Sequence, residues 1–313
     1  MEDYPANLME FDARFSTEEA CRDYLFSLRW PDGFCCPRCG GGKAWPTQRG
    51  LWHCAGCSHQ VSVTAGTIFQ DTRKPLRMWF RAMWWVTSQK TGGSAAGLQQ
   101  ILGLGSYQTA WTWLHKLRRA MVRPGRDRLQ GKVELDETYV GGHEDGIIGR
   151  GAKDKVLVAI AVEKDGRRMG RVRMDVINDF TAAELCGFVR RAVEPGATVR
   201  TDGLRSYLAL PRHGYVHDRI VHRRQAEPAS KLMPAVHRVA SLLKRWLLGT
   251  HHGRISRDHF GYYLDEFTFR FNRRTSRHRG KLFYRLVQHA VAVEPTPYKQ
   301  IIDHDCPDAD HKL

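Results

Sequence analysis

Four cysteines stand in two pairs with the spacing of a metal site. Cys36 and Cys39 form one Cys-x-x-Cys pair, Cys54 and Cys57 form a second pair, and fourteen residues separate the two pairs. Two such pairs can give four thiolates to one tetrahedral Zn²⁺, and this spacing favours zinc over a redox pair. Because four thiolates leave no open coordination position, this zinc is expected to hold a fold together rather than to catalyse a reaction.

A carboxylate stands inside a short strand predicted over residues 133–140. The apolar residues of this segment and the glycine pair behind it indicate a mostly buried strand followed by a turn. Asp136 therefore lies in or beside a hydrophobic sheet, where an ionised carboxylate costs several kcal/mol unless a cation or several donors satisfy it. A metal ion is one such cation, and the alternative is a strand whose acids face solvent or pair with arginines.

Two later segments carry further candidate ligands. A short strand predicted over residues 197–203 ends in Asp202 and a glycine, at the edge where open α/β sheets bind ligands. A helix predicted over residues 235–248 carries His237 and Lys244, which lie two turns and roughly 10 Å apart on one side of the helix. Each signal is weak alone, because turn aspartates and structural helical histidines are common.

The elements that must position these residues change in type along the chain. Residues 10–30 predict a helical lead-in, residues 75–121 predict three helices, and residues from 132 onward predict strands and helices in alternation. We therefore expect a multidomain protein of α+β and α/β class, with the following parts: a helical lead-in over 1–30, a zinc ribbon over 31–70, a helix-turn-helix domain over 75–125, a catalytic domain over 130–290 and a tail over 291–313.

A brief turn joins the second and third helices of the 75–125 region, which is typical of a helix-turn-helix. Tyr107, Gln108 and Thr109 then stand near the start of the third helix, where base edges are usually read. A basic run follows and is expected to contact phosphates; it includes Lys116, Arg118 and Arg119. A plain helical connector with an aromatic core is the alternative interpretation.

The charge of the chain indicates a polyanionic partner. Its 313 residues include 49 Lys and Arg against 33 Asp and Glu, a formal charge of +16. No apolar run approaches the length of a bilayer span, and the acidic N-terminus lacks the features of a signal peptide. We therefore expect no membrane association, a cytoplasmic protein and a nucleic-acid partner.

Over about residues 10–290 the chain resembles bacterial insertion-sequence transposases that have an N-terminal zinc ribbon and an ISXO-like DDE domain of the ribonuclease-H-like fold. Besides the four cysteines, the motifs that carry the resemblance are Asp136-Glu137-Thr138-Tyr139-Val140-Gly141-Gly142, Thr201-Asp202-Gly203, Leu243-Lys244-Arg245, Gly249-Thr250-His251-His252, Tyr263-Leu264-Asp265-Glu266-Phe267 and Phe271-Asn272-Arg273-Arg274. The resemblance implies a mixed sheet with flanking helices.

The resemblance also implies a site. Asp136 and Asp202 match the first two acids of the family, whereas the third position, seven residues before Lys244, holds His237 in place of the usual glutamate. The set would bind two Mg²⁺ or Mn²⁺ ions, and imidazole favours the softer Mn²⁺. Glu134 and Glu137 would lie outside the metal site, against its ligands or in solvent.

In the same comparison Lys244 would position a phosphate at the element end, and Arg245 would assist. A further basic cluster that includes Arg273 and Arg274 would contact transposon or target DNA. The family implies a nucleoid-associated bacterial protein that works as a dimer or larger assembly on terminal inverted repeats.

Three functions stay open on the sequence alone. The first is a DNA transposase that cleaves and joins strands. The second is a zinc-ribbon and helix-turn-helix regulator with a vestigial catalytic domain, and the third is a ribonuclease-H-like nuclease that cuts without joining. The acids favour an enzyme, and His237 is the main argument against one.

Overall fold

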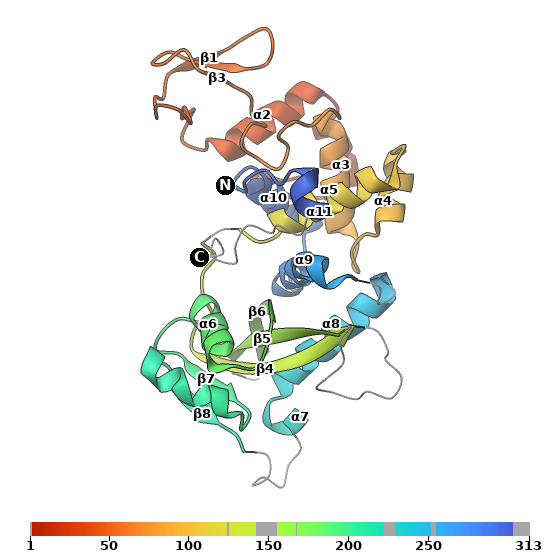
Figure 1. Ribbon diagram of the computed structural model, residues 1–313. Coiled ribbons are helices and arrows are strands. Elements are labelled where there is room, and N and C mark those ends of the chain that lie inside the picture. Colours follow the sequence, from red (N-terminus) through yellow and green to blue (C-terminus); the bar gives the residue numbers. More distant parts are fainter. Residues whose placement is uncertain are drawn as a thin grey trace. The chain divides into compact units, whose positions relative to one another are not determined.

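A computed structural model describes residues 2–123, 125–141, 155–166, 168–221, 229–251 and 255–302. Within these residues the chain forms two compact units (Figure 1). The first unit contains residues up to 123 and residues from 276 onward, and the second unit contains the residues between them. Gly142, His252 and residues 303–313, all of which the sequence analysis singled out, lie outside the described residues.

The first unit begins with two helices that bury aromatic side chains. Helix α1 spans Leu8–Arg14 and helix α2 spans Glu18–Arg29. The Thr17 hydroxyl caps α2 by accepting the backbone N–H of Ala20 at 3.1 Å. Phe11 and Phe15 are buried, and their rings lie 5.2 Å apart.

A small antiparallel sheet follows and forms the ribbon. Its strands are β1 at Ala44–Pro46, β2 at Trp52–Cys54 and β3 at Gln60–Val61, in the order β1-β2-β3. The register pairs Ala44 with Cys54, which fixes the second cysteine knuckle at the end of β2. The short strands agree with a fold whose stability comes from a metal rather than from a large core.

Three helices come next, close to the limits expected from the sequence: α3 at Leu76–Ser88, α4 at Ala95–Leu102 and α5 at Tyr107–Ala120. Gly103 ends α4 in the left-handed region with φ 61°, a conformation that glycine adopts without steric cost. The Ser94 side chain begins the same helix by accepting the N–H of Gly97. Helices α4 and α5 are therefore joined by a tight turn.

The C-terminal helices belong to the first unit. Helix α10 spans Arg279–Ala290 and α11 spans Tyr298–Ile302. Phe283 of α10 is fully buried, and its ring lies 5.3 Å from that of Phe11 and 5.7 Å from that of Phe80. From the sequence we expected the catalytic domain to extend to residue 290 and thus to include α10, whereas the structure places α10 in the first unit.

The second unit contains one five-stranded mixed sheet in the order β6-β5-β4-β7-β8. The strands are β4 at Lys132–Gly141, β5 at Lys155–Asp165, β6 at Arg168–Ile177, β7 at Thr198–Thr201 and β8 at Val216–Arg219. Strands β4, β5 and β6 are antiparallel neighbours, whereas β7 pairs parallel with β4, and β8 pairs parallel with β7. This arrangement is consistent with a ribonuclease-H-like sheet, with β4 in the centre.

Helices cover both faces of this sheet. The helical elements are α6 at Ala182–Ala192, a 3-10 helix η1 at Arg205–His213, α7 at Ala229–Leu232, α8 at Pro234–His251, a 3-10 turn η3 at Arg257–His259 and α9 at Phe260–Asn272. Leu135 of β4 belongs to the core that includes α6 and η1, whereas Val140 belongs to the core that includes α8 and α9. The two faces of β4 thus meet different helices.

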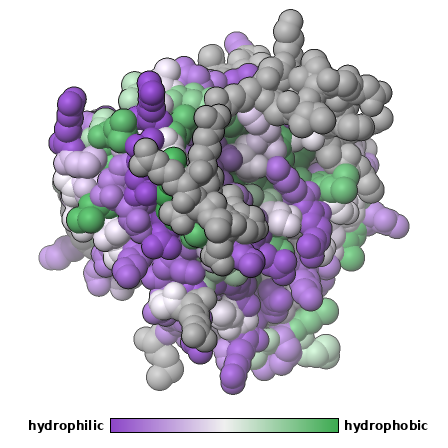
Figure 2. All heavy atoms as spheres, turned by 90° about the horizontal axis from the view of Figure 1, so that it is seen from below, coloured by the Kyte–Doolittle hydropathy of each residue, from purple (hydrophilic) through white to green (hydrophobic). Residues whose placement is uncertain are grey.

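The surface agrees with a polar environment. Figure 2 shows one face on which hydrophilic side chains predominate and hydrophobic side chains stand in small, separate groups. Among the helices that the structure describes, none has both the length and the hydropathy needed to cross a bilayer.

Candidate functional site

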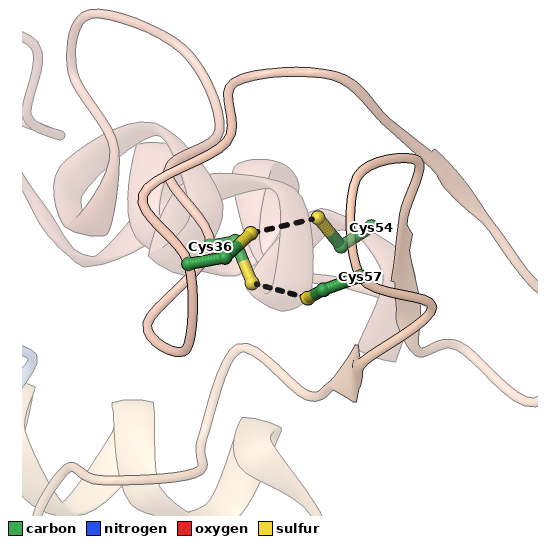
Figure 3. Close-up of side chains that lie close together, drawn as sticks. Cys36, Cys54 and Cys57 are labelled. Carbon is green, nitrogen blue, oxygen red and sulfur yellow. Dashed lines mark hydrogen bonds between the residues drawn. The ribbon is translucent and has the colours of Figure 1, made fainter.

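The four cysteines of the ribbon lie together as the sequence predicts (Figure 3). Their sulfur atoms are all within 4.8 Å of one another, with 3.7 Å between Cys36 and Cys57 and 3.6 Å between Cys39 and Cys54. A zinc ion with four Zn–S bonds of about 2.3 Å separates its sulfurs by about 3.8 Å, so the cluster fits Zn²⁺.

The backbone around Cys36 favours the thiolate form of this one ligand, whereas the neighbouring thiols raise the pKa of Cys39. Burial raises the pKa of the Cys36 thiol, but the backbone N–H groups of Arg38 and Cys39 donate to its sulfur and lower the pKa to about 7. The free Cys35 beside it is exposed and lies outside the cluster. The four cysteines therefore have the arrangement of a closed, structural zinc site.

The second unit brings Asp136 and Asp202 to neighbouring strands. The parallel register pairs Val133 of β4 with Val199 of β7, and Glu134 with Arg200. Asp202 directly follows the end of β7. If the pairing of β4 with β7 is continued by two residues, Asp202 lies beside Asp136. Adjacent strands lie about 4.8 Å apart, so the backbone holds the two aspartates as neighbours.

Helix α8 adds the imidazole of His237 to this edge of the sheet. The His237 Nδ1 atom lies 3.7 Å from the Asp136 Oδ2 atom, and the two side chains are 34% and 22% exposed. The His237 Nε2 atom is buried and has no hydrogen-bond partner in the part of the chain that the structure describes. An imidazole nitrogen beside a carboxylate is suited to a metal ion, because both groups are common metal ligands.

The fit of these residues to divalent ions is partial. Ligand atoms 3.7 Å apart are close enough to share one ion, and the Asp136 and His237 side chains meet this condition. The Asp202 Oδ1 atom instead accepts the backbone N–H of Leu204 at 2.9 Å. Across the described ranges, the four cysteines are the only group of three or more His, Cys, Asp or Glu close enough to share an ion.

Lys244 lies further along α8, on the same helix as His237. Burial of part of its side chain lowers the pKa of the Lys244 ammonium, nearby Lys155 lowers it further, and Asp136 acts in the opposite direction. Lys244 and Arg245 are both exposed, so the ammonium of Lys244 and the guanidinium of Arg245 are accessible to a phosphate backbone.

The other acid of the motif and the nearby tyrosine point away from this edge. The Tyr207 hydroxyl donates to the Glu137 carboxylate, and Tyr207 belongs to the core on the α6 face. Tyr139 packs against the same core, with its ring 6.1 Å from that of Phe180. Strand alternation thus separates these side chains from Asp136, as we expected.

The contact of Glu134 with the start of α8 could not be predicted from the sequence. Glu134 is only 3% exposed, although it is an acid on the strand that carries Asp136. Its Oε2 atom accepts the backbone N–H groups of Ala235 and Val236, at 2.8 and 3.1 Å. The only available signal was its even spacing from Asp136, which places both on one face of β4.

The DNA-contact candidates on α5 differ in exposure. Tyr107 and Gln108 are exposed and Thr109 is half-buried, and the Gln108 amide also donates to the Tyr298 hydroxyl of α11. Lys116 and Arg119 are half-buried. Arg118 is only 2% exposed, because helical periodicity places it on the buried face with Leu114, so the structure does not present it to DNA.

Arg273 and Arg274 make contacts within the second unit. Arg274 donates to the carbonyl oxygens of Gly170 and Phe271 at 3.2 and 2.9 Å, and also to that of Met169 on the edge strand β6. The Arg273 guanidinium lies 4.1 Å from the centre of the Phe269 ring. These contacts give both arginines a packing role in addition to any contact with DNA.

Two family models and one relative match parts of this chain. Residues 16–60 match the transposase zinc-ribbon domain, and residues 128–272 match the ISXO2-like transposase domain. A protein of the archaeon Halobacterium salinarum, described as an uncharacterized protein in transposable element ISH50, is 28% identical over 279 residues, which cover 82% of this chain and 91% of the relative.

A closed four-cysteine ribbon followed by a mixed sheet with helices on both faces defines the class of zinc-ribbon proteins with a ribonuclease-H-like domain. The chain belongs to the IS1595 family of transposases, which combine an N-terminal zinc ribbon with an ISXO2-like DDE domain. The expected resemblance is thereby confirmed. The relative comes from an archaeon, and the bacterial source that we expected stays a prediction.

Proposed function

We propose that the protein is the DNA transposase of an insertion sequence, which binds the ends of its element, cleaves them and joins them to target DNA. Two observations support this proposal: His237 of α8 lies 3.7 Å from Asp136 of β4, and Asp202 directly follows β7, the strand that pairs with β4. The transposase domain implies catalytic activity, and a metal-dependent phosphoryl transfer requires such a set of ligands.

Each residue has a separate part in this reaction. Divalent ions at the site would lower the pKa of an attacking water or 3′-hydroxyl and stabilise the leaving oxygen. Asp136, on the central strand, would serve both ions, with Asp202 on one and His237 on the other. For Asp202 this requires its carboxylate to turn from the N–H of Leu204 toward the ion.

The choice of metal follows from the ligand charges. Two carboxylates and a neutral imidazole carry one negative charge less than three carboxylates, and imidazole is a softer donor. We therefore propose that Mn²⁺ supports the reaction better than Mg²⁺. Zinc remains in the ribbon, where its four thiolates exclude it from the chemistry.

The DNA contacts are proposed from exposure and charge. Lys244 and Arg245 on α8 would hold the phosphates beside the site, and Tyr107, Gln108 and Thr109 would face the bases if α4 and α5 act as a helix-turn-helix. The formal charge of +16 supports binding to both element ends and target DNA. Pairing of two ends would require a dimer or larger assembly.

The test is incubation of the purified protein with labelled element ends and target DNA in Mg²⁺ or Mn²⁺. Joined products support the transposase, cleavage without joining supports a nuclease, and bound but intact DNA supports a regulator. Asp136→Ala should lower the cleavage rate at least about 100-fold, because bound ions supply several kcal/mol to the transition state. End binding should stay within about twofold, and the exposed Asp165→Ala should change neither quantity.

A further inference from the structure

Glu134 is a buried acid that joins the central strand to the helix of the site. Its carboxylate accepts the two N–H groups at the start of α8, from Ala235 at 2.8 Å and from Val236 at 3.1 Å. The other carboxylate oxygen lies 3.6 Å from the Lys164 ammonium, and the Glu134 side chain is only 4% exposed. A buried carboxylate persists only where donors and a cation satisfy it in this way.

Helix α8 depends on this distant carboxylate because its own sequence offers no cap. The helix begins at Pro234, and the residue before it is Met233, whose side chain is a poor acceptor for backbone N–H groups. Glu134 supplies the acceptor from another element of the fold. Its negative charge also complements the positive end of the helix dipole.

The same turn of α8 carries the ligand of the site. His237 follows Val236 directly, and its Nδ1 atom lies 3.7 Å from Asp136. Glu134 and Asp136 stand two residues apart on one face of β4, which separates them by about 7 Å along the strand. Strand β4 therefore contacts the first turn of α8 at two points. Glu134 accepts hydrogen bonds from the helix backbone, and Asp136 lies beside the imidazole of His237.

We infer that Glu134 is a positioning residue, which fixes the start of α8 so that His237 and Asp136 can bind one divalent ion. The inference deepens the proposed function and depends on it for the identity of the site. Groups that orient metal ligands through hydrogen bonds typically contribute 10–100-fold to metal affinity. A residue that only stabilised the fold would lower the melting temperature without such a specific loss.

The experiment is a double-mutant cycle on Mn²⁺ affinity, measured by electron paramagnetic resonance on the zinc-loaded, full-length protein without DNA. Glu134→Ala should weaken Mn²⁺ binding about 10–100-fold. In the His237→Ala background, the same Glu134→Ala change should alter the affinity less than about twofold, because the ligand that Glu134 positions is already absent. Equal losses in both backgrounds would overturn the inference.

Two variants keep the test decisive. Glu163→Gln removes another half-buried acid of the sheet, one that pairs with Arg171 rather than with α8, and should leave the Mn²⁺ affinity unchanged. Glu134→Gln keeps an oxygen that can accept both N–H groups, so it should retain more Mn²⁺ affinity than Glu134→Ala. If Glu134→Ala does not fold, the cycle is repeated with Glu134→Gln. The loss of Mn²⁺ affinity caused by Glu134→Gln must then also disappear in the His237→Ala background.

Amide hydrogen exchange separates this inference from the proposed function. Without added metal or DNA, Glu134→Gln should speed exchange at Ala235 and Val236, because a neutral amide oxygen accepts their N–H groups more weakly than a carboxylate does; Glu163→Gln should not change it. Absence of Mn²⁺ binding by the unmodified protein would refute the proposed metal site. Unchanged exchange in the Glu134 variant would refute the positioning role, whether or not the protein cleaves DNA.

Discussion

Replacement of His237 by glutamate should make the stability of the second unit depend on divalent ions. His237→Glu would place a second carboxylate near Asp136, where the imidazole nitrogen now lies 3.7 Å from the aspartate oxygen. Two like charges at this distance repel by about 4 kcal/mol at an effective dielectric constant of about 20. Because the two side chains are 34% and 22% exposed, we discount this to about 2 kcal/mol.

A loss of about 2 kcal/mol corresponds to a fall of roughly 4–8 °C in melting temperature for a domain of this size. The assay is thermal unfolding of the zinc-loaded protein at neutral pH, with and without Mg²⁺. His237→Gln is the matched control, because it has nearly the same shape as glutamate but no charge. Mg²⁺ should restore the Glu variant and leave the Gln variant unchanged.

Two results would refute this reasoning. If the Glu and Gln variants melt at the same temperature without Mg²⁺, residue 237 does not face Asp136 in solution. If the Glu variant is destabilised but no divalent ion restores it, the two side chains are neighbours but do not form a metal site. The His237→Glu variant should also change its metal preference in DNA cleavage from Mn²⁺ toward Mg²⁺, since three carboxylates suit the harder ion.

Other predictions concern the ribbon and the sheet. Cys54→Ser should abolish binding of zinc, measured as metal per chain by mass spectrometry, because three thiolates remain. Burial opposes ionisation of Glu163, but hydrogen bonds from Arg171 and from backbone N–H groups outweigh it and lower its pKa to about 2. Since this folded-state pKa is below the ordinary 4.5, the stabilisation is present above pH 4.5 and is lost as the pH falls toward 2; Glu163→Gln should remove that part of the pH dependence of urea unfolding. Asn272→Ala should lower the free energy of unfolding by about 1–3 kcal/mol in the same assay, because the Asn272 amide both donates to and accepts from the backbone of Val172.

Local patterns in the sequence predicted most elements of this protein. The three helices between residues 75 and 121, the strand expected over 133–140 and the helix expected over 235–248 lie close to their expected limits. The four cysteines were also predictable, because zinc geometry restricts how far apart its ligands stand along the chain. The resemblance to the transposase family identified Asp136 and Asp202, which alone were ordinary strand and turn residues.

Periodicity indicates which face of an element is buried, but not which element covers it. For this reason the sequence placed α10 with the catalytic domain, although Phe283 packs into the first unit. It also presented Arg118 as a phosphate contact, although the residue is buried. Both differences depend on contacts between residues far apart in the chain.

By itself the sequence determined the ligand types of the ribbon and most of the secondary-structure elements, because these depend on residue type and short spacing. The two aspartates came from the resemblance to the transposase family. Only the tertiary structure decided that Glu134 begins α8 and that His237 meets Asp136. These residues are about a hundred positions apart in the chain, and only the packing of α8 on β4 brings them within a few ångströms.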